Sequence, residues 1–144
     1  MKKRITLICF LATLLMIKSP ELYAQCDANG FTESCITKLG DGFTFLKSFK
    51  IDGENGHKNK VEYSYVFSKD TQYFINVCSP GINTDGIVVT MYDSNRNQVG
   101  TNLMNNNFYP GFVYPCNATG IYYITFTFRD SQNFCGGSSL GFKR

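Results

Sequence analysis

The chain has 144 residues, of which 43% are hydrophobic, 15% aromatic and 17% charged. This composition is sufficient for one domain with a packed core, and it excludes an intrinsically disordered chain, which would have few aromatic residues and a large net charge. The formal net charge is +3, but the basic excess comes from the first 24 residues, and the remainder carries ten basic and ten acidic side chains. We therefore expect no nucleic-acid partner.

Residues 1–24 are predicted to be a secretory signal peptide. A basic region at residues 2–4 precedes thirteen mostly apolar residues, 5–17, whereas a membrane-spanning helix needs roughly 20. We expect cleavage after Ala24, which makes Gln25 the new N-terminus of a mature chain that does not span a membrane. Lipidation of Cys26 and an uncleaved anchor are the alternatives. The predicted location is the periplasm, the cell surface or the extracellular space.

The cysteines of an exported chain are expected to form disulfides. The mature chain keeps five, Cys26, Cys35, Cys78, Cys116 and Cys135, so one stays unpaired and fifteen arrangements are open. Cys78 and Cys116 lie at predicted strand ends, where a bridge closing nearly forty residues would add roughly 4 kcal/mol. Cys26 and Cys35 bridge each other, or one of them reaches Cys135.

Regular alternation of apolar and polar residues predicts an all-β chain after one short helix. Phe31, Cys35 and Leu39 share a helical face over residues 31–39, and Gly40 suits the C-cap. Strands are expected at 43–51, 61–67, 73–78, 87–92, 98–103, 108–114, 121–128 and 134–143, separated by turns rich in Gly, Asn, Asp and Ser. Because no further helix separates them, we predict an antiparallel two-layer sandwich of jelly-roll type over 43–144, preceded by an extension at 25–42.

Three of these strands have informative patterns. In 43–51, Phe43, Phe45, Phe49 and Ile51 are predicted to face the core, with Leu46 as the exception on the polar face. Residues 87–92 are apolar on both faces, as expected of a central strand. Pro110 and Gly111 interrupt 108–114, which favours a strand at a sheet edge.

The order of features between residues 61 and 128 resembles the bacterial pre-peptidase C-terminal (PPC) module. An aromatic-rich strand at 62–67 and a turn at 68–71 lead to a strand at 72–77, and VVTMYDSNRN at 88–97 and TGIYYI at 119–124 follow. The resemblance covers about half of the mature chain. It implies a non-catalytic, jelly-roll-like appendage of secreted proteins that aids secretion or holds a substrate or surface. This chain differs by its added cysteines, its N-terminal extension and its lack of a catalytic domain.

Few residues suggest metal or catalytic chemistry. Asp93, Asn95 and Asn97 imitate the start of a calcium loop, but Gly and Glu are missing at the later positions that such a loop needs, so we favour a hairpin turn and keep Asp93 as a weak calcium candidate. The single histidine, His57, lies in a polar turn with no nucleophile motif nearby. We expect no cofactor and no catalytic residue.

Aromatic residues are the remaining candidates for a binding surface. Most of the 13 Phe and 9 Tyr fall at alternate strand positions and are predicted to fill the core. The candidates for an exposed patch are Tyr109, Phe112 and Tyr114 around the interrupted strand, with Tyr92 and Tyr122 placed less clearly. Asn117 begins an N-glycosylation sequon that also suits a turn.

The sequence therefore predicts a secreted, non-catalytic β-sandwich binding or accessory module that contacts a protein or a glycan. One alternative is a structural subunit of an envelope or secretion complex. Another is a hydrolase whose paired carboxylates come from distant strands.

Overall fold

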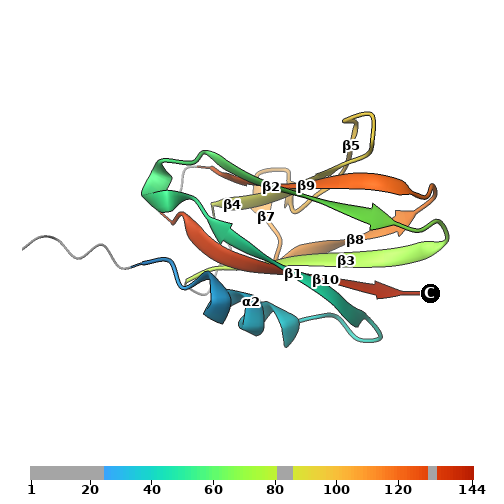
Figure 1. Ribbon diagram of the computed structural model, residues 1–144, viewed down its shortest axis with the longest axis horizontal. Coiled ribbons are helices and arrows are strands. Elements are labelled where there is room, and N and C mark those ends of the chain that lie inside the picture. Colours follow the sequence, from blue (N-terminus) through green and yellow to red (C-terminus); the bar gives the residue numbers. More distant parts are fainter. Residues whose placement is uncertain (1–24, 81–85, 130–132) are drawn as a thin grey trace, which may run out of the picture.

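The computed structural model describes residues 25–80, 86–129 and 133–144, and the signal peptide predicted over 1–24 lies outside them. Eight strands make up a sandwich: β1 (Thr44–Asp52), β2 (Lys60–Phe67), β3 (Thr71–Cys78), β4 (Ile87–Tyr92), β5 (Gln98–Thr101), β8 (Gly111–Cys116), β9 (Gly120–Phe128) and β10 (Cys135–Lys143). Sheet A has the antiparallel order β1-β10-β3-β8, and sheet B has the antiparallel order β2-β9-β4-β5 (Figure 1).

This strand order is that of a jelly roll, so the predicted fold class is confirmed. The prediction of eight strands falls short of the ten found among the described residues, because β6 (Leu103–Met104) and β7 (Asn107–Phe108) form an additional two-stranded pair. β4 has the predicted bounds and lies between β9 and β5, and β8 lies at the edge of sheet A, as expected for each. A short 3₁₀ turn, η1 (Glu54–Gly56), connects β1 to β2.

Helix α2 (Ala28–Ile36) packs on the outer face of sheet A, over β10, β1 and β3 (Figure 1). The Asp27 carboxylate caps its N-terminus by accepting a hydrogen bond of 3.1 Å from the Gly30 amide. The helix begins and ends three residues earlier than predicted, and its C-cap is Thr37. The expectation that Gly40 forms the C-cap is therefore wrong.

The core lies between the two sheets, where aromatic rings pack together with isoleucine, valine, leucine and methionine side chains. Phe67 stacks on Tyr73 at 3.9 Å between ring centroids and on Tyr122 at 4.9 Å. Phe49 and Phe126 are at most 1% exposed. Closely packed rings bury a large apolar area and fix one arrangement of the strands.

A β-bulge in β1 reverses two of the predicted side-chain directions. The pairing with β10 shifts between Phe45 and Lys47. As a result, Leu46 packs against the core and Phe45 is 43% exposed. The alternation predicted for this strand is wrong at these two positions, because one extra residue in a strand changes the face that the neighbouring side chains occupy. The prediction that Phe43 faces the core is also wrong, since its ring packs against Phe74, with centroids 5.5 Å apart, and is not part of the core.

Two disulfides, Cys26–Cys135 and Cys35–Cys78, tie the N-terminal segment to sheet A, and Cys116 is free and buried. The bridge expected between Cys78 and Cys116 is therefore wrong. Both residues lie at the C-terminal ends of their strands, but β3 and β8 are antiparallel, so Cys116 pairs with Thr71. Thr71 is at the opposite end of β3 from Cys78, about 24 Å along the strand. The alternative that an N-terminal cysteine reaches Cys135 is confirmed for Cys26.

Candidate binding surface

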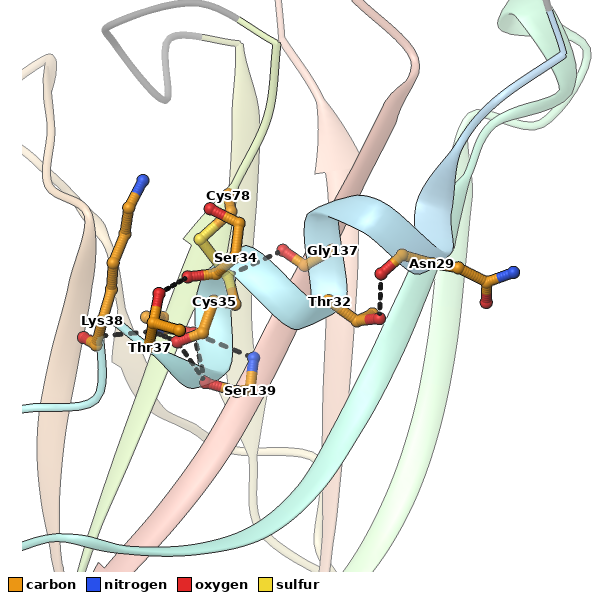
Figure 2. Close-up of a disulfide and its surroundings, with 10 residues drawn as sticks. Asn29, Thr32, Ser34, Cys35, Thr37, Lys38, Cys78, Gly137 and Ser139 are labelled. Atoms are coloured by element: carbon orange, nitrogen blue, oxygen red, sulfur yellow. Dashed lines mark hydrogen bonds between the residues drawn. A yellow bond between two sulfur atoms is a disulfide. The ribbon is translucent and has the colours of Figure 1, made fainter.

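Helix α2 covers the outer face of sheet A and is linked to it by the Cys35–Cys78 disulfide (Figure 2). Gly137 of β10 lies against the helix, and a Cβ added there would overlap the backbone of Thr32. Beside it, the buried Asn76 side chain donates to the Cys35 carbonyl at 2.9 Å and accepts from both the amide and the hydroxyl of Ser139 at 2.8 Å. The helix therefore joins the sheet through satisfied polar groups and a covalent link.

The outer face of sheet B differs, because the helix of the described chain packs on the other sheet. The strand register places outward side chains in rows across β2, β9 and β4, with Ser64, Tyr123 and Tyr92 in one row. We call these outward residues, together with Arg96 from the β4–β5 turn, the sheet B face: Lys60, Glu62, Ser64, Val66, Thr90, Tyr92, Arg96, Ile121, Tyr123, Thr125 and Thr127.

Arg96 crosses this face and is held by Tyr123 and Glu62. Its guanidinium carbon lies 3.6 Å from the centroid of the Tyr123 ring. Its Nη1 and Nη2 donate to the two carboxylate oxygens of Glu62 at 2.9 and 3.1 Å. The Thr125 hydroxyl donates to the same carboxylate at 2.9 Å. The hydrogen bonds from Arg96, and to a lesser extent that from Thr125, lower the pKa of Glu62, so the pair stays ionised.

Two exposed apolar side chains extend the sheet B face toward one end of the sandwich. Val66 is 58% exposed and Ile121 is 48% exposed, and they are register partners on β2 and β9. Around Arg96 the sheet B face contains a depression of about 230 Å³. This volume is below the range typical of small-molecule pockets, about 300–1,000 Å³, so the face is better shaped for a macromolecule.

The structure does not bring the three aromatic residues expected at the β8 edge onto one surface. Side chains alternate along β8, so Phe112 and Tyr114 turn inward, the first against Gly100 and the second against Tyr122, with ring centroids 5.5 Å apart. Tyr109 is 42% exposed, and the exposed residues of the strand are Val113 and Pro115. Of the two less clearly placed tyrosines, Tyr92 belongs to the sheet B face and Tyr122 is buried.

The weak calcium candidate, Asp93, forms part of the β4–β5 turn. Its Oδ1 accepts hydrogen bonds from the amides of Asn95 and Asn97 at 2.9 Å, and its Oδ2 accepts one from the Asn97 side chain at 3.0 Å. These bonds, led by that from the Asn97 side chain, lower the pKa of Asp93. The described residues contain no cluster of three or more His, Cys, Asp or Glu side chains able to hold a metal ion. His57 and Asn117 are both exposed.

Sequence reasoning missed Glu62 and Arg96. The alternation of apolar and polar residues in 60–67 directs Glu62 away from the core, and the alternation in 121–128 directs Tyr123 away from it. The outward direction of both side chains could therefore be predicted from the sequence. Their proximity depends on the pairing of β2 with β9 and on a turn that carries Arg96 back over the sheet with a φ of +65°.

No protein-family model and no curated protein matches this chain. Several solved structures are similar to it, among them the following three. PliG of Aeromonas hydrophila, a periplasmic inhibitor of g-type lysozyme, shows 13% identity over 72% of this chain and 87% of its own, with a TM-score of 0.43. The pre-peptidase C-terminal domain of a Bacillus anthracis collagenase shows 16% identity over 70% and 89%, with a TM-score of 0.44. The glycosylation-associated Gap123 complex of Streptococcus agalactiae shows 11% identity over 72% and 39%, with a TM-score of 0.37.

A solved PPC domain is thus among the structures that this chain is similar to, in keeping with the resemblance indicated by the sequence motifs. At these identities the likeness concerns the arrangement of the strands and not an activity. No helix of the described residues is long and apolar enough to cross a bilayer. Two disulfides are typical of proteins outside the cytosol.

Proposed function

We propose that this protein is an exported, non-catalytic binding module and that a protein partner binds the sheet B face. The observation that carries the proposal is the fixed Arg96–Tyr123–Glu62 arrangement beside the exposed Val66 and Ile121. Arginine, tyrosine and a small apolar patch are typical of the residues that dominate the energy of protein–protein contacts. The two disulfides support the export of the chain.

The arrangement around Tyr123 favours a protein partner over a glycan at this face. A sugar ring that stacks on a tyrosine needs one free face of the ring, and Arg96 already covers one face of Tyr123 at 3.6 Å. Because Arg96 is held by the ring and by two hydrogen bonds, a partner that contacts it does not have to order it first.

The proposal is tested by photo-crosslinking in the native host. A photoreactive amino acid is placed at Ile121 on the sheet B face or at Val113 on the outer side of sheet A, two strand positions that are each 48% exposed. We expect a discrete adduct with one protein from position 121 and none from position 113. Equal adducts at both positions, or none at either, would contradict the proposal.

Once the adduct identifies the partner, matched charge variants measure the contribution of the face. Ile121→Asp is expected to weaken binding of the purified partner by about tenfold or more, since it buries an unpaired charge in the contact, whereas Val113→Asp leaves binding within about twofold. Circular dichroism of both variants confirms that the fold is intact. Equal losses in the two variants would place the contact elsewhere.

A further inference from the structure

A second depression lies at one end of the sandwich, between the β4–β5 turn and the β8–β9 turn, and shares Ile121 with the sheet B face. It has a volume of about 410 Å³, within the range of sites that bind small ligands. The residues that line it combine hydroxyl, amide and aromatic groups with two apolar side chains: Asp93, Ser94, Asn95, Val99, Tyr114, Asn117, Ala118, Thr119, Gly120, Ile121 and Tyr122.

The tyrosines of the depression are held in fixed positions. The Tyr114 hydroxyl donates to the Tyr122 hydroxyl at 3.3 Å, and the Tyr122 hydroxyl donates to the Ala118 carbonyl at 2.8 Å. The Tyr122 ring also stacks on Phe67. Burial, followed by the hydrogen bonds with Tyr114 and Cys116, raises the pKa of Tyr122, so the Tyr122 hydroxyl stays neutral at physiological pH. The Tyr114 oxygen keeps acceptor capacity for a ligand hydroxyl.

The rim of the depression supplies polar groups without a free charge. Ser94, Asn95 and Asn117 are exposed, and their side chains offer hydroxyl and amide groups that both donate and accept. Asp93 is the charged residue of the lining, and both of its carboxylate oxygens already accept hydrogen bonds within the turn.

We propose that this depression binds a neutral saccharide, one or two sugar residues in size. A sugar matches the lining in two respects, because its hydroxyls pair with the amides and hydroxyls of the rim and its C–H surface packs against Val99, Ile121 and the tyrosines. The lining contains Asp93 and no cation, which disfavours an anionic ligand. Its many polar groups would lose water without compensation against a purely apolar ligand.

Gly120 provides a direct test of the site. It lines the depression, its φ is not positive, and a Cβ added there meets no atom within 4 Å. Gly120→Leu therefore fills the space without straining the fold, and Gly120→Ala fills it partly. Gly40→Ala is the matched control on the sheet A side, where the new Cβ meets the Phe43 ring at an ordinary 3.6 Å.

The measurement is a titration of the isotope-labelled, disulfide-bonded protein with maltotriose, triacetylchitotriose and lactose, followed by amide chemical shifts. We expect saturable shifts of Ser94, Asn95 and Asn117 with at least one of these sugars. Gly120→Leu should weaken this binding by about tenfold or more, Gly120→Ala by less, and Gly40→Ala by less than about twofold.

Three results would overturn the saccharide site: no saturable shift with any of the three sugars, shifts that persist in Gly120→Leu, or tighter binding of the anionic sialyllactose. Failure of the saccharide site is distinguishable from failure of the protein contact when the photoreactive amino acid is placed at Val66, which lies on the sheet B face and outside the lining of the depression. Gly120→Leu leaves Arg96, Tyr123 and Val66 in place, so the crosslink from Val66 is expected to survive in it.

Discussion

The two outer faces of the sandwich each belong to a sheet of four antiparallel strands, and they differ in the size of their outward side chains. On sheet A, glycine and serine at Gly137 and Ser139 let a helix approach the backbone, and a disulfide holds it there. On sheet B, Tyr123, Tyr92 and Arg96 stand above the strands. Small residues therefore mark the face that the chain covers with its own helix, and large fixed side chains stand on the face that the helix leaves uncovered.

The largest effect on stability is expected from removing the disulfide that holds α2 on the outer face of sheet A. Cys35→Ser together with Cys78→Ser opens a loop of 43 residues and should lower the free energy of unfolding by about 4 kcal/mol. Urea denaturation followed by circular dichroism measures this loss.

The matched control for the disulfide is Cys116→Ser, which removes a buried thiol that forms no bridge and should cost about 1 kcal/mol. Alkylation of the denatured, unreduced protein is expected to label one thiol. Five labelled thiols, or equal losses of stability in the two variants, would contradict the assigned pairing.

A smaller effect is expected from a single methyl group between helix and sheet. In Gly137→Ala the new Cβ would lie 2.6 Å from the Phe31 carbonyl carbon, so α2 must shift, at a cost of about 1–3 kcal/mol. The amide of Ser139, which donates to Asn76, should exchange faster with solvent.

The control for this variant is Gly120→Ala, which adds the same methyl group in open space and should change stability by less than about 0.5 kcal/mol. If Gly137→Ala proved as stable as Gly120→Ala, the tight seating of α2 on sheet A would be refuted.

The smallest effect on stability is expected from a substitution on the sheet B face. Glu62→Gln removes a charge pair whose side chains are 25% and 52% exposed, and should lower Tm by no more than about 3 °C. Because the pKa of Glu62 is lowered in the folded state, its contribution is fully present above the unfolded pKa of about 4.3 and is lost as the pH falls through the folded value. The difference in Tm should therefore be constant from about pH 5 to 8 and shrink below about pH 4.

Thermal unfolding of the wild type and Glu62→Gln across this pH range measures the difference. Glu54→Gln is the control, because Glu54 pairs with Lys58 in a turn where both side chains are 53% exposed. A pH-independent difference for Glu62→Gln would indicate that its carboxylate is not the group responsible.

Much of the fold could be predicted from the sequence, because a strand with one buried face alternates apolar and polar residues along its own length. Residues 87–92 gave the bounds of β4, and the jelly-roll class followed from eight such segments without intervening helices. Features that depend on which elements pack against each other could not be predicted from the sequence. The bulge at Phe45 is set by β10, and the Cys35–Cys78 bridge is set by the seating of α2.

The candidate site was harder to predict for the same reason. Phe112 and Tyr114 are aromatic residues next to a proline, and only the alternation along β8 and the position of sheet B show that they face inward. Arg96 belongs to a polar turn that has no motif, and its role depends on Tyr123 and Glu62, which lie on two other strands.

The bridge between Cys26 and Cys135 joins residues 109 positions apart and so makes nearly all of the sandwich a closed covalent ring, with the smaller Cys35–Cys78 ring inside it. A protease that cuts one peptide bond anywhere between these two cysteines leaves both fragments attached through sulfur. Such a nicked molecule would migrate as one piece until its disulfides are reduced.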